Sequence, residues 1–280
     1  IHQVVKTMPE GPEIRRAADK LADVLVGKHI TRARFAQPKL RGKAKKLVGH
    51  TVLDIETRGK ALLTHFDHGQ TIYSHNQLYG VWRVVKGHKL PETTRSLRIL
   101  LQTEHHSAIL YSASDISVWP TEELAQHPFL ARIGPDIMNP DLTWQQIADR
   151  LGEARFARRD LATLYLDQAF LAGNGNYLRS EVLHDARINP RRRPESLSRG
   201  ELGRLARSTL ALSRRSYDTG GITLKPRLAG KLKQSGAGWE RRRFYVFGRS
   251  GQPCYYCGTD IVRTTANSRR LYHCPQCQPA

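Results

Sequence analysis

The sequence predicts an α+β protein of two domains: a β-sandwich with an N-terminal helix, and a helical domain that ends in a cysteine-rich β-hairpin. Three observations lead to this class. The chain has 280 residues, and a domain typically takes ~150. Short segments rich in β-branched and aromatic residues fill positions 30–111, and helical periodicity prevails from residue 143 onwards. All four cysteines lie beyond residue 250.

The first domain begins with an expected helix after Pro12, because apolar residues follow one helical face and Gly27 supplies a stop signal. These apolar residues are Ile14, Ala17, Ala18, Leu21 and Leu25. Six short strands are expected next, at 51–55, 61–66, 71–74, 80–85, 97–101 and 108–111. Their number and spacing are typical of a sandwich or barrel.

The second domain is expected to be helical, with helices at 143–151, 160–171, 177–186 and 201–214. The Gly-Pro and Asn-Pro breaks at 134–135 and 139–140 indicate an interdomain linker. The expected organisation is therefore 9–130 (sandwich), 131–141 (linker), 142–218 (helical domain), 219–243 (basic loop) and 244–280 (zinc finger).

Charge narrows the class of partner. The formal net charge is +20, and the last third, from Arg187, holds 20 of the 45 basic residues but only 5 of the 25 acidic ones. A folded surface this basic favours a polyanion. The sequence has neither a membrane-length apolar run nor a secretory signal, so we expect a soluble intracellular protein that binds nucleic acid.

The four cysteines form two C-x-x-C pairs, a spacing typical of a zinc site. An intracellular location disfavours the alternative, disulfide bonds. We expect one structural Zn²⁺ ion, because four thiolates leave no position for a catalytic water. The strands expected at 261–265 and 269–273, with a turn at 267–268, make this segment a hairpin that carries arginines. The expected ligands are Cys254, Cys257, Cys274 and Cys277.

Seven residues precede Met8, and Met8 is followed by Pro9-Glu10-Gly11-Pro12. We expect translation to begin at Met8. Because proline is small enough to permit removal of the initiator methionine, the mature chain would begin at Pro9, without residues 1–8. Taken alone, Pro9 is more simply explained as a helix-initiating proline.

Five motifs in order resemble the formamidopyrimidine-DNA glycosylase and endonuclease VIII family, and endonuclease VIII most closely. They are Pro9–Ile14, Thr57–Leu63, Tyr73–Trp82, Asp167–Arg179 and the C-terminal cysteine pairs. The resemblance covers the chain from Met8 onwards. It implies a helix–two-turn–helix DNA-binding element, and a DNA repair enzyme that excises oxidised bases, mainly pyrimidines, and then cuts the strand.

The resemblance implies that Pro9 is the nucleophile that forms a Schiff base with the sugar. An α-amino group titrates near ~8, so a free proline amine is substantially unprotonated at neutral pH. Glu10 would donate a proton to the sugar ring oxygen, although a carboxylate here also suits a helix N-terminus. Glu13 is expected to cap the helix or to order the loop beneath the site.

Two basic residues would act on the phosphates. By resemblance, Lys60 is the general acid of β-elimination and contacts the phosphate beside the lesion, whereas a lysine at a strand end is usually a solvated charge. Arg269 matches the arginine that grips the flanking phosphates and assists δ-elimination. Arg270 is an alternative to Arg269. The family often has a small residue or proline where Arg270 stands, so in this chain two neighbouring arginines match the position by spacing.

Five further residues are expected to hold the DNA. A glycine-rich turn before Asn176 would let backbone N–H groups approach a phosphate, although a simple helix connection also explains it. The apolar pair Leu78 and Tyr79 at a loop tip is better explained as a wedge that fills the gap left by an extruded nucleotide than by stability. Arg132 would reach towards the opposite strand. The expected DNA-binding residues are Gln77, Leu78, Tyr79, Arg132 and Asn176.

We therefore expect a bifunctional DNA glycosylase and AP lyase acting by β,δ-elimination on double-stranded DNA with oxidised bases or abasic sites. The expected protein is a bacterial, cytoplasmic, nucleoid-associated monomer that binds no membrane. The alternative is a non-catalytic zinc-ribbon protein that binds DNA or RNA, which the charge and cysteines fit equally well.

Overall fold

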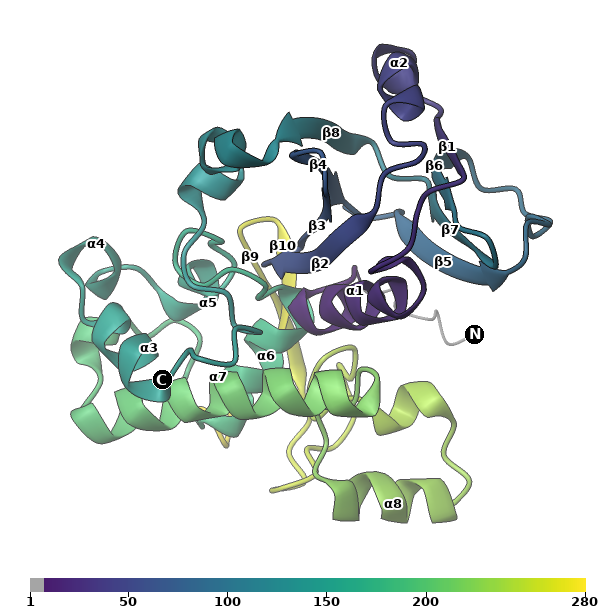
Figure 1. Ribbon diagram of the computed structural model, residues 1–280. Coiled ribbons are helices and arrows are strands. Elements are labelled where there is room, and N and C mark those ends of the chain that lie inside the picture. The colour runs from purple at the N-terminus through teal and green to yellow at the C-terminus, as the bar shows by residue number, and fades with distance from the viewer. Residues whose placement is uncertain (1–7) are drawn as a thin grey trace. The chain divides into compact units, whose positions relative to one another are not determined.

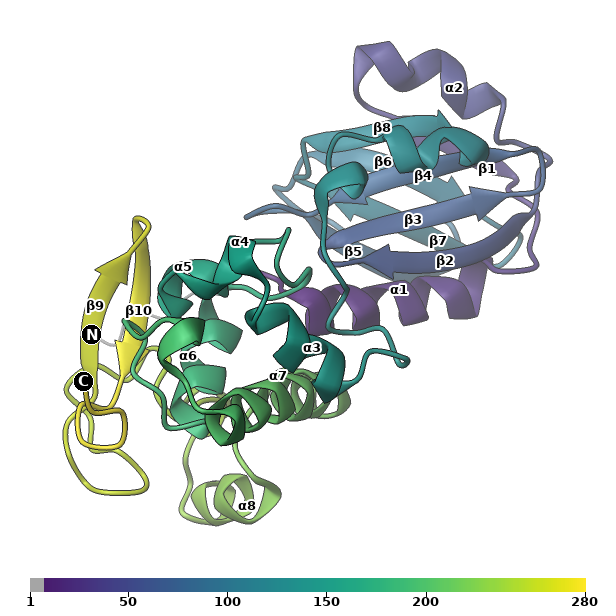
Figure 2. The same ribbon diagram turned by 90° about the vertical axis from the view of Figure 1, so that its left-hand side faces the viewer.

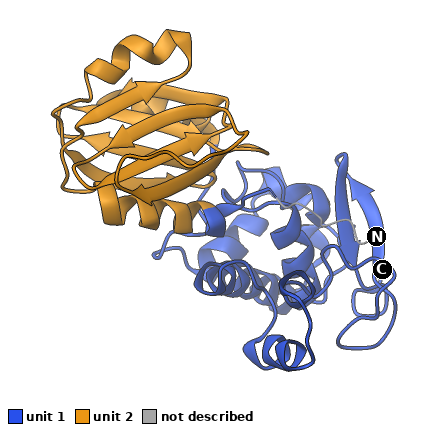
Figure 3. Cartoon of the chain, turned by 90° about the vertical axis from the view of Figure 1, so that its right-hand side faces the viewer, with its two compact units in different colours: residues 1–13, 133–280 blue, residues 14–132 orange. Residues whose placement is uncertain are grey.

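The computed structural model describes residues 8–280 (Figure 1). The expectation that residues 1–7 are absent from the mature protein falls outside the described residues. The chain forms two compact units, one of residues 14–132 and one that joins the chain up to Glu13 with residues 133–280 (Figure 3). Pro9 and Glu10 therefore group with the helical unit, whereas we expected them in the sandwich domain.

The unit of residues 14–132 contains the expected β-sandwich, made of two antiparallel four-stranded sheets (Figure 2). Apolar side chains from both sheets and from the first helix form its core. One sheet has the order β2 (Val52–Arg58), β3 (Ala61–Phe66), β4 (Gln70–His75), β8 (Asp115–Pro120). The other has the order β1 (Arg32–Phe35), β6 (Leu97–Gln102), β7 (His106–Tyr111), β5 (Val81–Lys86).

All six predicted strands are confirmed, and the sequence analysis missed two, β1 and β8. In β1, only Phe35 is buried, so the strand lacks the apolar run that marks the others. In β8, buried residues alternate with half-buried ones. The short elements of this unit are η1 (Pro38–Leu40), α2 (Arg41–Lys45), η2 (Thr121–Gln126) and η3 (Leu130–Arg132).

The first helix, α1 (Gly11–Leu25), is confirmed. Its start is capped by Glu13, whose Oε2 accepts a hydrogen bond from Glu10 N at 3.0 Å. This is the capping role expected of Glu13. The helix ends before Gly27, which has φ of +72°.

The helical unit differs from expectation in two places. The helix expected at 160–171 is only α5 (Leu161–Leu164), since the chain turns after Tyr165 and Asp167 accepts a hydrogen bond from Ala169 N at 2.8 Å. Residues 219–243, expected as a basic loop, contain α8 (Pro226–Gln234), which starts with the helix-initiating Pro226. The other elements are α3 (Trp144–Leu151), α4 (Ala154–Ala157), α6 (Asn176–Asp185), η4 (Pro194–Ser196), α7 (Arg199–Thr219) and η5 (Trp239–Arg242).

The C-terminal hairpin is confirmed as β9 (Val262–Ala266) and β10 (Arg269–His273). Its two turn residues, Asn267 and Ser268, both have positive φ, as in a two-residue type I′ turn. Glu181 of α6 helps to fix the chain ahead of the hairpin, because its buried carboxylate accepts hydrogen bonds from the consecutive backbone N–H groups of residues 245–247.

No helix within residues 8–280 is long and apolar enough to span a membrane.

Candidate active site

The Glu10 side chain is buried against the first turn of α6. Its Oε1 accepts a hydrogen bond from Tyr177 N at 2.8 Å, and its Oε2 accepts one from Leu178 N at 3.2 Å. These N–H groups belong to the helix start, where no intrahelical acceptor exists. Glu10 thus supplies a negative charge to the positive end of the α6 dipole, and only 2% of the residue is exposed.

This arrangement requires glycines in the turn before α6. Gly11 N donates to Gly173 O at 2.8 Å, and a Cβ on Gly11 would lie 3.1 Å from Gly173 Cα. A Cβ on Gly175 would lie 2.4 Å from Cδ of Glu10. Gly173 has φ of +99°, which side chains disfavour. The glycine-rich turn therefore lets the N-terminal segment pack directly on backbone.

Beneath Glu10, Tyr177 connects two elements. The Tyr177 hydroxyl donates to Glu13 Oε1 and Oε2 at 2.9 and 3.1 Å, and it lies 2.8 Å from Ser216 Oγ of α7. Burial raises the pKa of Glu13, although its hydrogen bonds from Glu10 N and Tyr177 oppose that shift. Burial and the nearby carboxylates raise the pKa of Tyr177 well above its usual value, so the hydroxyl remains a donor.

Arg179 is fully buried and joins α6 to the hairpin. Its Nη2 donates to Asn176 Oδ1 at 2.6 Å and to Arg270 O at 3.0 Å, and its Nη1 donates to Ala162 O at 2.8 Å. Burial lowers the pKa of Arg179 to about 10, and the charge of Arg269 contributes to that shift. Arg179 thus connects Asn176 to Arg270, which follows the exposed Arg269 in the chain.

The sequence analysis missed the roles of Arg179 and Tyr177. The available signal was the spacing of Asn176 and Arg179, which places them on adjacent turns of one helical face. It was obscured because Tyr177 to His184 are all buried, so α6 lacks the polar face of a surface helix.

In the sandwich unit, Lys60 and the Gln77 loop lie at the same end of two neighbouring strands, β3 and β4. Ala61, which follows Lys60, pairs with His75, which ends β4. The chain then enters residues 76–80, where Gln77 has φ of +49° and its Oε1 accepts from Ser114 Oγ at 2.7 Å. Burial lowers the pKa of His75, and the positive charge of Lys60 adds to that effect.

The apolar loop tip is exposed, as a wedge requires. Leu78 is 44% and Tyr79 is 61% exposed, and Arg95 Nη1 donates to Tyr79 O at 2.8 Å. Arg132 lies on a different element, η3, where its Nε donates to Pro128 O at 2.7 Å.

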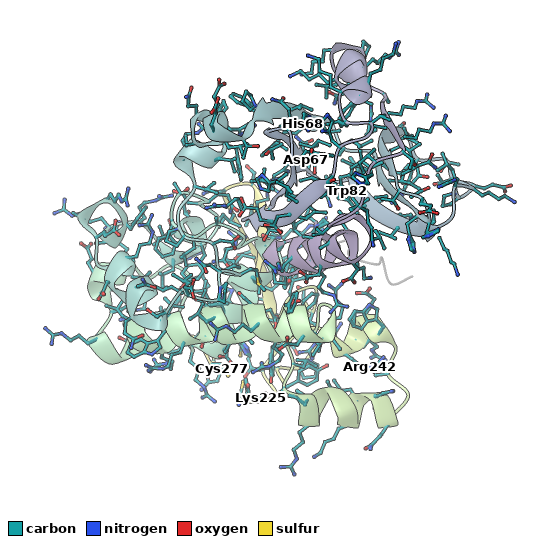
Figure 4. The ribbon with its side chains drawn as sticks, in the orientation of Figure 1. Asp67, His68, Trp82, Lys225, Arg242 and Cys277 are labelled. Atoms are coloured by element: carbon teal, nitrogen blue, oxygen red, sulfur yellow. The ribbon has the colours of Figure 1, made fainter. Side chains whose placement is uncertain are left out.

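The four cysteines converge as predicted. Their sulfur atoms all lie within 4.8 Å of one another, with 3.9 Å between Cys254 and Cys277 and 3.4 Å between Cys257 and Cys274 (Figure 4 labels Cys277). Tetrahedral Zn–S bonds of ~2.3 Å place neighbouring sulfurs ~3.8 Å apart, so the cluster fits a metal ion of that size.

A β-sandwich, a glycine-rich turn that receives the Glu10 side chain, and a four-cysteine cluster are combined in a class of DNA glycosylases with AP lyase activity. The family model for the formamidopyrimidine-DNA glycosylase N-terminal domain matches residues 8–114, and that for the corresponding H2TH domain matches residues 133–227. The chain therefore belongs to the formamidopyrimidine-DNA glycosylase family, whose members act in base excision repair.

Relatives named endonuclease 8 are similar over their whole length. That of Pectobacterium atrosepticum is 50% identical, and that of Escherichia coli strain UMN026 is 49% identical, each over 97% of this chain and 100% of the relative. Two complexes of Lactococcus lactis Fpg, with N7-benzyl-Fapy-dG DNA and with abasic-site DNA, share the fold. Both have TM-scores of 0.80, are 22% and 21% identical, and cover 97% of this chain and 100% of their own.

Proposed function

We propose that this protein removes oxidised bases, mainly pyrimidines, from double-stranded DNA and cleaves the strand through a Schiff base on Pro9. The observation that carries the proposal is the double hydrogen bond of Glu10 to the start of α6. It fixes the residue next to Pro9, so an amine at that position would be held in one place rather than on a loose chain end.

The proposal requires a chain that begins at Pro9, because an amide nitrogen has no free electron pair. The match to the N-terminal family model starts at Met8, which supports translation from that residue. A free Pro9 amine would attack C1′ of the nucleotide and form an N–C1′ bond. The bond between C1′ and the base breaks, and the base leaves with those electrons and takes up a proton.

Glu10 would then serve as a proton carrier. Both of its oxygens accept hydrogen bonds in the structure. We propose that it takes the proton released by Pro9 when the N–C1′ bond forms, and returns it to O4′ when the C1′–O4′ bond opens. The product of ring opening is an iminium between Pro9 and C1′.

Strand cleavage follows from the iminium. It acidifies C2′, so loss of a C2′ proton expels the 3′-phosphate, and loss of a C4′ proton then expels the 5′-phosphate. We propose that Lys60 supplies the proton to the leaving phosphate and that Arg269 binds the flanking phosphate. We propose Arg269 rather than Arg270 for this contact because the Arg270 backbone is held by Arg179, whereas Arg269 is exposed at the start of β10.

The remaining contacts would bend and open the duplex. We propose that Asn176 binds a backbone phosphate at the start of α6 and that Arg132 contacts the opposite strand. Leu78 and Tyr79 would fill the space left by the flipped nucleotide, with Gln77 shaping the loop. The exposure of this apolar pair supports a wedge.

The cysteine cluster would hold one Zn²⁺ ion through all four thiolates, and such an ion would cross-link the base of the hairpin. The ion would hold β9 and β10, and with them Arg269 at the start of β10, in place. Because all four of its ligands would be sulfur atoms, its role would be structural. Metal analysis of purified protein should find one zinc per cluster, and a Cys274→Ser variant should lose it together with DNA affinity.

The charge of the chain and the names of its relatives support a proposal about its binding partner and its location in the cell. We propose that a single copy of the chain binds damaged DNA and that the +20 charge keeps the protein on bacterial chromosomal DNA. One of the similar Fpg structures is described as a complex with DNA containing an oxidised pyrimidine, which supports that substrate class.

Borohydride reduction tests the nucleophile. Protein that begins at Pro9 should form a covalent adduct with DNA containing an oxidised pyrimidine, and peptide mapping should place the DNA on Pro9. Protein that retains Met8 should bind the same DNA without forming this adduct. An adduct on Lys60, or gel shifts with no adduct and no cleavage, would overturn the proposal, and the latter would favour a non-catalytic binder.

A further inference from the structure

Two histidines and an aspartate form a cluster in the sandwich unit, apart from every residue assigned above. His50 directly precedes Thr51 and the start of β2, and Asp67 and His68 lie in the turn that joins β3 to β4. Figure 4 labels Asp67 and His68 one below the other in the upper part of the view. One potential ligand atom from each of the three residues lies within 4.8 Å of the other two.

The distances suit a small cation. Asp67 Oδ1 lies 2.8 Å from His50 Nδ1 and 3.7 Å from His68 Nδ1. Ligand atoms bound tetrahedrally at 2.0–2.2 Å from one ion are ~3.3 Å apart, so these separations fall on either side of that value. The two imidazole rings stack with centroids 3.9 Å apart, so the rings would have to turn for both to bind one ion.

His68 lacks hydrogen-bond partners. Neither of its ring nitrogens is exposed to solvent, and neither has a partner within hydrogen-bond distance. A buried polar group in this state normally costs free energy and calls for an explanation. A metal ion bound to one of these nitrogens would supply the missing partner.

Hydrogen bonds hold the Asp67 side chain in place. Its Oδ2 accepts one from Thr51 N at 2.9 Å, and its Oδ1 lies 2.8 Å from His50 Nδ1. His29 also faces the cluster, through a hydrogen bond of its Nδ1 with Thr51 Oγ1 at 3.0 Å. The cluster thus combines one carboxylate with imidazoles, which is a typical ligand set for zinc, nickel and related ions.

We propose that His50, Asp67 and His68 bind one divalent transition-metal ion such as Zn²⁺ or Ni²⁺. The ion would be additional to the one in the cysteine cluster, and water would complete its coordination. It would satisfy His68 and connect the start of β2 to the β3–β4 turn. Because the site involves neither DNA nor Pro9, it is independent of the proposed function.

Metal counting tests the proposal on untagged protein whose cysteine cluster is filled. Equilibrium dialysis against Zn²⁺, followed by mass spectrometric analysis of metal content, should find two ions in the unaltered chain and one in His68→Ala and His50→Ala. The matched control is His105→Ala, because the His105 side chain is 72% exposed at another turn, and it should retain two. Thermal unfolding in Ni²⁺ should move to higher temperature only in chains with the intact cluster.

One ion in the unaltered chain would overturn the proposal. Two ions in both His50→Ala and His68→Ala would also overturn it, because the second ion would then be bound elsewhere. Far-ultraviolet circular dichroism of each variant without added metal shows whether the fold is retained, and a folded His50→Ala chain suffices for the test if His68→Ala does not fold.

Discussion

Gly175 leaves open the space that the Glu10 carboxylate occupies. A Cβ on Gly175 would lie 2.4 Å from Cδ and 2.5 Å from Oε1 of Glu10. A Cβ at position 175 would therefore force the Glu10 carboxyl group to move. The position of Pro9 depends on this fit, because Pro9 is bonded to Glu10.

Gly175→Ala should displace Glu10 and lower the rate of adduct formation about 100-fold, since a shift of ~1 Å at a reacting group costs on that order. Single-turnover borohydride trapping measures the effect. Gly230→Ala is the matched control, because no atom lies within 4 Å of a Cβ at Gly230 in α8. It should keep full activity and gain ~0.5–1 kcal/mol in stability. Normal trapping by Gly175→Ala would contradict the assigned role of Glu10.

Arg179→Lys should destabilise the protein by ~3 kcal/mol, because lysine cannot make the forked hydrogen bonds to Asn176 and Arg270, and bonds to charged groups contribute ~1.5–3 kcal/mol each. Urea unfolding measures this change. The control is Arg155→Lys, because the Arg155 side chain is 64% exposed in its pair with Glu153. That change should stay within ~0.5 kcal/mol. Equal stability of the two variants would refute a structural role for Arg179.

Low pH should destabilise the protein through Glu201, which caps the start of α7. Arg192 and the backbone of Ser198 lower the pKa of Glu201 to about 2. Because the folded-state pKa lies below the usual 4.5, this stabilisation is complete above pH 4.5 and is lost as the pH falls towards 2. Between pH 6 and pH 2.5, the free energy of unfolding should fall by ~1 kcal/mol more in the unaltered protein than in Glu201→Gln. Parallel pH profiles would show that the pair contributes nothing.

Replacing the wedge should affect only paired substrates. Leu78→Ala and Tyr79→Ala should slow excision from duplex DNA by about tenfold, because opening the stack costs a few kcal/mol, but should leave cleavage of a lesion in single-stranded DNA unchanged. Leu53→Ala is the matched control, because Leu53 is also apolar and 58% exposed. Equal losses on both substrates would point to a folding defect instead.

DNA affinity should fall steeply with salt, with a slope of about 0.9 per phosphate contacted in a plot of log affinity against log salt. Arg269→Ala should reduce the slope by about 1. Arg270→Ala should change the slope less. Arg158→Ala is the control and should not change the slope, because the Arg158 side chain is 86% exposed beside Glu195. A larger effect of Arg270→Ala would transfer the phosphate contact to that residue.

The sequence predicted those parts of the fold that rest on local patterns. Six strands, α1 and the cysteine hairpin follow from periodicity, turn residues and spacing, and all are observed. The helix expected at 160–171 was wrong, because a local hydrogen bond to Asp167 turns a chain whose composition suits a helix. The contacts of Glu10 with α6 and of Arg179 with the hairpin lay beyond any local pattern, since their partners are backbone atoms distant in sequence.

Glu10 and Tyr177 are separated by 167 residues. At a synthesis rate of ~5–20 residues per second, the binding partner of Glu10 leaves the ribosome on the order of ten to thirty seconds after Glu10 itself. During that interval the residues around Pro9 would be accessible to the enzymes that remove Met8 if the chain starts as proposed. The order of synthesis would thus separate this removal from the docking of Glu10, because Glu10 is fixed only when the turn around Gly175 exists to receive it.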